Sequence, residues 1–114
     1  MSLDFYLETP YCAACGRDGT ELFWANCTHN LGKMARSADI YTELWHPDEG
    51  GYEYAGDIVA ALEEGLRDMK ARPKVYKVDN PPNGWGTYDG FIEFVEGVLA
   101  ACKRNPDALI RTST

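Results

Sequence analysis

The feature that most constrains the fold is an apolar stripe near the C-terminal end of the chain. Six apolar residues recur at intervals of three and four positions: Phe91, Phe94, Val95, Val98, Leu99 and Cys102. This spacing places them on one face of an α-helix, and Asn105-Pro106 ends the helix because proline cannot continue it. A helix with one apolar face buries that face against another element. The rest of the chain therefore has to supply a covering layer.

Two further helical segments precede this one. Apolar residues at the same spacing are Ile58, Val59, Leu62, Leu66 and Met69. Their pattern ends at Arg72-Pro73. A shorter helix is predicted from Leu31, and residues 40–45 either continue it after a break or form a short helix of their own. Residues 46–51 contain a proline and a glycine pair and are predicted to form a loop, and the Pro-rich segment 74–83 leads to the last helix.

The covering layer is predicted to be a small β-sheet. Residues 3–7 and 21–24 are rich in strand formers and are separated by a loop-like segment, so they are predicted to form a hairpin. Residues 108–112 could return as a strand beside the first one. We therefore predict one α+β domain over residues 1–114, in which two or three amphipathic helices pack on a two- or three-stranded antiparallel sheet.

Composition limits the partners of this domain. The chain has 114 residues, of which 45% are hydrophobic, enough for one core. Its 18 acidic against 11 basic residues give a net charge of -7, which disfavours nucleic-acid polymers and anionic membranes because both would be repelled. The sequence contains neither a signal-peptide pattern nor a run of membrane-spanning length. We expect a cytoplasmic protein.

A first group of candidate ligand-binding residues lies before the shorter helix, in NCTHNLGKMA. The polar residues of this group are Asn26, Thr28, His29 and Asn30. Unpaired backbone N–H groups and a positive dipole at a helix start suit carboxylate or phosphate oxygens. Lys33 and Arg36, one and two turns further on, could supply positive charge. The alternative is that Thr28 or Asn30 caps the helix and has no other role.

A second group precedes the C-terminal helix. Its candidate residues are Asn83, Trp85, Gly86, Thr87 and Tyr88. Glycines on both sides of Trp85 let the backbone turn sharply and present the indole, and Thr87 or Asp89 can cap the helix. Aromatic rings beside open N–H groups suit a pocket that stacks on a base and binds phosphate. We expect the two groups to meet around one ligand, with Trp45 as a further aromatic residue. The alternative is that Trp85 closes the end of a small core.

Cysteine spacing raises the question of zinc. Cys12 and Cys15 have the CxxC spacing with which two thiolates bind Zn²⁺, but a structural site needs four ligands. The nearby donors Cys27 and His29 complete an order that matches no common zinc finger. Zinc at Cys12 and Cys15 is therefore one hypothesis, and two unpaired thiols in a hairpin loop are the other. No other cofactor is expected.

The order of residues contains no recognisable catalytic motif. We find no Ser-His-Asp arrangement, no HExxH motif and no glycine-rich phosphate loop. Glu21, Glu43 or Glu49 could pair with His29 as an acid–base couple, but nothing singles one of them out. No residue is therefore assigned as catalytic, and binding without catalysis is the favoured class.

Long strings of this sequence resemble a family of small proteins encoded by bacteriophages and by bacterial genomes that carry phage-like elements. These strings are SLDFYLE, ANCTHNLGKMA, IYTELWHPDE and NPPNGWGTYDGFIEFVEGVLAACKRNPDA, and together they span nearly the whole chain. In that family the position of Cys27 is usually aliphatic and the CxxC loop is variable, which implies no shared zinc site. Phages encode compact, oligomeric cytosolic proteins that sequester cyclic or ADP-ribose-derived nucleotide signals of host defence. The resemblance to such proteins is one of class only.

Three functions are therefore compared with the structure below. The first is a homo-oligomeric binding protein that sequesters a nucleotide-type defence signal without catalysis. The second is a protein-interaction module that inhibits a host protein through a face containing Trp45, Tyr52 and Tyr54. The third is a small hydrolase that uses His29 and a carboxylate.

Overall fold

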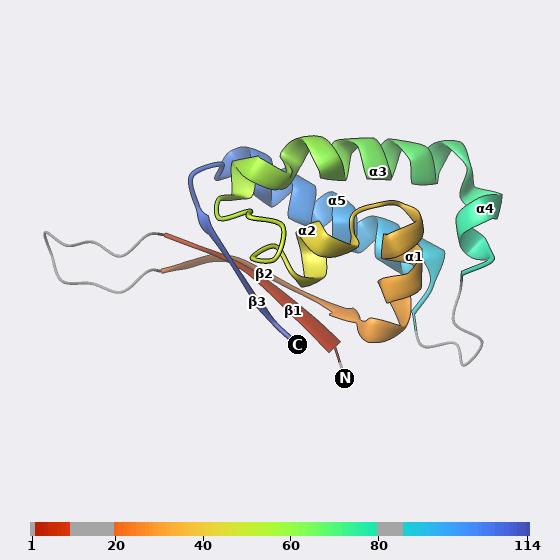
Figure 1. The fold of residues 1–114 in the computed structure, drawn as a ribbon, viewed down its shortest axis with the longest axis horizontal. Coiled ribbons are helices and arrows are strands. Elements are labelled where there is room, and N and C mark those ends of the chain that lie inside the picture. Colours follow the sequence, from red (N-terminus) through yellow and green to blue (C-terminus); the bar gives the residue numbers. More distant parts are fainter. Residues whose placement is uncertain (1, 10–19, 80–85) are drawn as a thin grey trace, which may run out of the picture.

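A three-stranded antiparallel sheet forms one layer of the molecule (Figure 1). The computed structural model describes residues 2–9, 20–79 and 86–114. The strands are β1 (Ser2–Glu8), β2 (Glu21–Thr28) and β3 (Leu109–Ser113), and their order in the sheet is β2-β1-β3. Tyr6 in the central strand pairs with Trp24 on one side and with Arg111 on the other.

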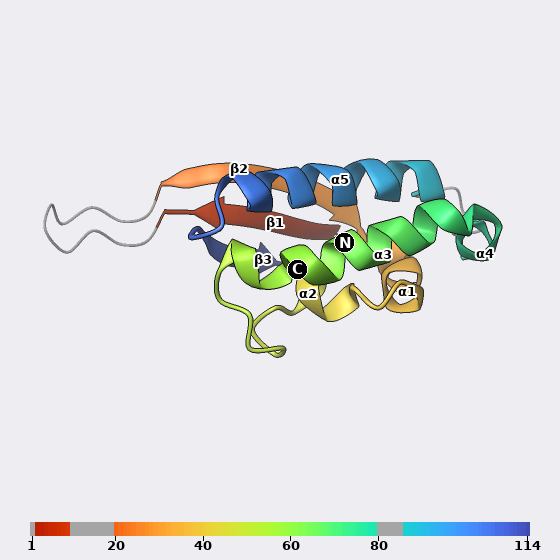
Figure 2. The same cartoon turned by 90° about the horizontal axis from the view of Figure 1, so that it is seen from above.

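The helices lie together on one face of this sheet (Figures 1 and 2). They are α1 (Gly32–Ser37), α2 (Tyr41–Trp45), α3 (Val59–Ala71), α4 (Pro73–Lys77) and α5 (Tyr88–Arg104), with 3₁₀ turns η1 (His29–Leu31) and η2 (Ala55–Ile58). The long helices α3 and α5 lie side by side, and α5 contacts β2. The predicted α+β class is therefore confirmed.

The alternation of buried and partly buried residues in β1 shows which face of the sheet the helices cover. Leu3, Phe5 and Leu7 are fully buried, whereas Asp4 and Tyr6 between them are only partly buried. Successive side chains of a strand point to opposite faces, so the three apolar residues meet the helices. The apolar stripe of α5 is buried against them, as its three-four spacing predicts.

Two elements differ from the sequence prediction. The second strand continues to Thr28, because Ser2 pairs with Thr28 and holds the chain extended. Asn26 and Cys27 therefore belong to the strand, whereas Thr28 ends the strand and caps η1, as predicted for Thr28. The Pro-rich segment after α3 contains the short helix α4, with Pro73 at its first position. Proline is well tolerated there because the first helical N–H groups have no intrahelical acceptor.

Among the helices of the described ranges, none is long and apolar enough to cross a membrane.

Candidate functional site

Gly86 of the second predicted group lies against the first predicted group, beside Thr28 and Leu31. Gly86 adopts a φ of +101°, and a Cβ atom there would lie 2.7 Å from Cγ2 of Thr28. Only glycine combines this backbone conformation with so close an approach. Asp79 accepts a hydrogen bond of 2.8 Å from Ser37 Oγ and lies 3.7 Å from Lys33 Nζ. The described residues on both sides of 80–85 thus contact residues 28–37, while Asn83 and Trp85 lie outside the described residues.

A buried tryptophan holds His29 in one orientation. Trp45 is 2% exposed, and its Nε1–H donates a hydrogen bond of 2.9 Å to Nδ1 of His29. The indole stacks on Tyr41 with ring centroids 5.2 Å apart and an interplanar angle of 9°. A ring nitrogen that accepts a hydrogen bond carries no proton, so the proton of neutral His29 is on Nε2. Trp45 therefore acts through His29 and not, as the sequence suggested, as an exposed aromatic wall.

His29 consequently offers a hydrogen-bond donor. The imidazole is half-buried. In the part of the chain that the structure describes, no hydrogen bond or ion pair involves its Nε2. A histidine whose tautomer is set by a buried partner presents its second nitrogen with a defined chemistry and direction. The arrangement suits recognition of a ligand oxygen or of an unprotonated ring nitrogen.

The neighbours of His29 have mainly structural roles. Thr28 caps η1, and its Oγ1 accepts a hydrogen bond of 3.4 Å from Asn30 N. The amide of Asn26 donates to Asp4 Oδ1 at 2.9 Å and to Ser2 Oγ at 3.0 Å, which ties β2 to β1. Asn30 is exposed. Of the first predicted group, Nε2 of His29 and the side chain of Asn30 make no hydrogen bond within the described ranges.

Thr87 and Tyr88 begin α5 and stabilise the fold. Oγ1 of Thr87 accepts a hydrogen bond of 3.1 Å from Gly90 N, as expected of an N-cap residue. Tyr88 is buried, and its hydroxyl donates to the carbonyl of Met69 at 2.7 Å. In an α-helix that carbonyl would accept from residue 73, but Pro73 has no N–H. We assign Tyr88 a structural role, because its buried ring is not placed to stack on a ligand base.

Two cations lie on α1, as the sequence predicted. The side chain of Lys33 is 78% exposed and approaches Asp79. The guanidinium of Arg36 lies 4.0 Å from the ring centroid of Tyr41, the residue that stacks on Trp45. Lys33 is therefore free to reorient toward an anion, whereas Arg36 is held over an aromatic face.

Cys27 and Cys102, the cysteines that the structure describes, are buried, and burial raises the pKa of both thiols to about 12. Both thiols are therefore protonated at neutral pH in the metal-free protein. Within the described ranges, no group of three or more His, Cys, Asp or Glu residues is arranged to hold a metal ion. Cys12 and Cys15 lie outside these ranges, so the zinc hypothesis stays a prediction.

Individual contacts of the described residues bear on the two alternative functions. No carboxylate bonds to His29 in the described ranges, and Glu49 instead lies 3.3 Å from the other histidine, His46. The predicted aromatic interaction face was wrong for Trp45, which is buried. An exposed aromatic that sequence reasoning missed is Trp24, which is 54% exposed. It lies on the outer face of the sheet, a placement that follows from the strand register and not from its neighbours in sequence.

Comparisons of this chain with protein-family models, curated proteins and solved structures gave no significant match. The functional assignment therefore depends on the chemistry of its own residues.

Proposed function

We propose that this protein is a non-catalytic, homo-oligomeric binding protein that sequesters a small nucleotide-type ligand at the junction of η1, α1 and Gly86. The observation that carries the proposal is the hydrogen bond from Trp45 to His29 Nδ1, which leaves His29 Nε2 as an oriented donor. The resemblance to phage proteins suggests a cytosolic defence signal of the cyclic or ADP-ribose-derived type as the ligand.

Each part of the junction has a role in this proposal. The Nε2–H group of His29 donates to an acceptor on the ligand, and Asn30 offers an exposed amide beside it. Lys33 exchanges its ion pair with Asp79 for one with a ligand phosphate, because an exposed ion pair is weak and easily replaced. No carboxylate of the described residues bonds to His29, and in this proposal the ligand is bound and released unchanged.

The test is a thermal-shift screen against a panel of cyclic and ADP-ribose-derived nucleotides. A ligand present at about 100 times its Kd stabilises the folded state by about 2.7 kcal/mol. The protein is then denatured by heat and the released ligand is analysed by mass spectrometry. Recovery of intact nucleotide supports sequestration. Absence of a shift with every nucleotide refutes the proposed ligand class, and recovery of a cleaved product refutes the non-catalytic part.

Histidine variants locate the site. His29→Ala should reduce the ligand-induced shift strongly, whereas His46→Ala, the same change at the other histidine, should leave it unchanged. Trp45→Phe keeps the aromatic ring and removes the donor to His29, so it should weaken ligand binding while the protein stays folded. Equal shifts in the wild type and His29→Ala would exclude this junction as the site.

One observation favours a second candidate function, a protein-interaction module. Trp24 and Leu22 are both exposed on β2, and in the described structure no helix covers the outer face of the sheet. Exposed tryptophan is typical of interface hot spots. A single host protein retained in stoichiometric amount by the wild type and lost with Trp24→Ser would support this candidate. Retention of that protein by both would contradict it.

A further inference from the structure

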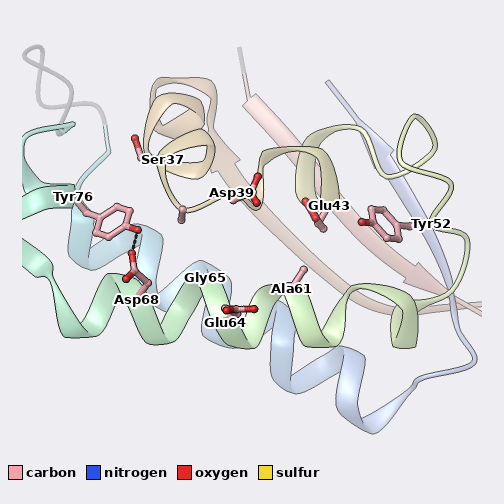
Figure 3. A pocket seen from close by; sticks show the side chains of 10 residues that line it. Ser37, Asp39, Glu43, Tyr52, Ala61, Glu64, Gly65, Asp68 and Tyr76 are labelled. Carbon is pink, nitrogen blue, oxygen red and sulfur yellow. Dashed lines mark hydrogen bonds between the residues drawn. The ribbon is translucent and has the colours of Figure 1, made fainter.

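A cavity lies between α3 and the segment from Ser37 to Glu43, away from the His29 junction (Figure 3). Its volume is about 500 Å³, within the range of small-molecule sites. Four carboxylates line it: Asp39, Glu43, Glu64 and Asp68. The described lining includes no Lys, Arg or His residue. The cavity therefore attracts cations and repels phosphates.

Glu43 distinguishes this cavity from an ordinary acidic surface. The residue is only 7% exposed, although it lies on α2 and lines the cavity. Within the described part of the chain it makes no hydrogen bond and no ion pair. No buried side-chain oxygen of the described residues lacks a partner, so the carboxylate oxygens of Glu43 are open to the cavity although the residue as a whole is buried. A cationic ligand in the cavity would pair with this carboxylate.

The other carboxylates differ in how far they are already paired. Asp68 bonds to Arg72 at 2.6 Å and accepts a hydrogen bond from the Tyr76 hydroxyl. Both contacts lower the pKa of Asp68, and the hydrogen bond with Arg72 has the larger effect. Asp39 and Glu64 make no side-chain hydrogen bond or ion pair within the described ranges. The charges left for a ligand are those of Asp39, Glu43 and Glu64.

The arrangement of these groups selects the kind of cation. In the described structure they form no cluster that could hold a metal ion. Asp39 and Glu43 lie on one side of the cavity and Glu64 lies on the facing helix (Figure 3). The cavity extends along α3 from Tyr76 to Tyr52, with Ala61 and Gly65 between them. Separated carboxylates along an elongated, partly apolar hollow match separated ammonium groups on an alkyl chain.

The wall that carries Asp39 is fixed against α3. A Cβ atom on Gly65 would lie 3.1 Å from the carbonyl oxygen of Ala38 and 2.6 Å from Cγ2 of Ile40. The absence of a side chain on Gly65 thus lets the chain pass close to α3. Asp39 itself has a φ of +60°, a conformation that aspartate tolerates better than most residues. The carboxylates are therefore held by backbone that close packing restrains.

We propose that this cavity binds a linear aliphatic polyamine. One ammonium group pairs with the carboxylate of Glu43, a second pairs with Glu64, and the alkyl chain lies along Ala61 and Gly65. The site is independent of the one proposed for a nucleotide-type ligand.

The test is isothermal titration calorimetry of the full chain with spermidine in about 0.15 M salt, where charges more than about 8 Å apart are largely screened. The wild type should bind one spermidine per chain. Glu43→Gln should weaken binding at least about tenfold, equivalent to about 1.4 kcal/mol. The matched control is Glu93→Gln, the same change at an exposed residue of α5 that does not line the cavity. This control should bind spermidine like the wild type.

A second variant and a second titrant keep the test decisive. Glu64→Gln changes an exposed residue and should weaken binding about threefold or more, even if Glu43→Gln fails to fold by circular dichroism. Absence of spermidine binding to the wild type would overturn the proposal. Equal weakening by Glu93→Gln would also overturn it, because it would show a general effect of negative charge. Tighter binding of Mg²⁺ than of spermidine, lost in Glu43→Gln, would overturn the choice of an organic cation.

Discussion

Replacing Tyr88 by phenylalanine removes the hydrogen bond that the Tyr88 hydroxyl donates to the end of α3, where a proline deprives a backbone carbonyl of its usual donor. The hydroxyl of Tyr88 donates to the carbonyl of Met69. In a continuous helix this carbonyl would accept from the backbone N–H of residue 73, but residue 73 is a proline and has none. Met69 is fully buried, so water does not replace the lost donor. A buried carbonyl left unpaired costs about 1–3 kcal/mol. Tyr88→Phe should therefore destabilise the protein by about this amount.

The corresponding change in Tm follows from chain length. At roughly 2.1 cal/mol/K per residue, the unfolding entropy of 114 residues is about 240 cal/mol/K. A loss of 1–3 kcal/mol then lowers Tm by about 4–12 °C. Burial raises the pKa of Tyr88, so the hydroxyl remains a donor throughout the neutral range and the effect should not vary between pH 6 and 9.

Urea and thermal unfolding followed by circular dichroism measure this loss. The control is Tyr6→Phe, because the ring of Tyr6 lies against Arg111 and its hydroxyl makes no hydrogen bond within the described ranges. Its stability should change by less than about 0.5 kcal/mol. A decrease for Tyr88→Phe no larger than that of the control would refute the view that this hydroxyl replaces the missing helical donor.

Three further results are expected. Gly86→Ala should lower the free energy of unfolding by about 1–3 kcal/mol, because its Cβ would collide with Thr28 in a backbone conformation unfavourable for alanine. The change is measured as a lower urea midpoint, and a midpoint equal to that of the wild type would contradict this. Iodoacetamide at pH 8 should leave Cys27 and Cys102 unmodified in the native protein and modify both in urea, as peptide mass spectrometry would show. The lowered pKa of Asp68 means that its contribution to stability is present at neutral pH and is lost as the pH falls below 3.8. The wild type should therefore exceed Asp68→Asn in stability at pH 7, and the difference should shrink at pH 3.

Local periodicity was sufficient to predict most of the secondary structure. The three-four spacing of α5 and the alternation of β1 were each visible within a few residues, because burial on one face leaves a repeating pattern. The return of β3 beside β1 also followed from composition. The extension of β2 to Thr28 was not predicted, because it depends on pairing with Ser2, far away in sequence.

The candidate sites also combine features that the local sequence predicts with features that depend on contacts between distant residues. The sequence indicated His29 as a ligand-binding residue from its polar neighbours, but those neighbours turned out to cap η1 or to join strands. Trp45 sets the tautomer of His29 from 16 residues away. Glu43 was one of three glutamates considered as partners for His29, and the structure places it in a cavity that His29 does not line. Nothing in its immediate sequence distinguishes it from an exposed glutamate.

The sequence by itself determined most of the helices and strands and the buried faces of β1, α3 and α5, since these depend on the spacing of apolar residues along the chain. The tertiary structure decided which polar groups meet: Trp45 with His29, Tyr88 with Met69, and Glu43 with an acidic cavity. Hydrogen bonds and carboxylate pairing act over a few ångströms in space, and residues 16 or 19 positions apart come within that distance only when the helices pack on the sheet.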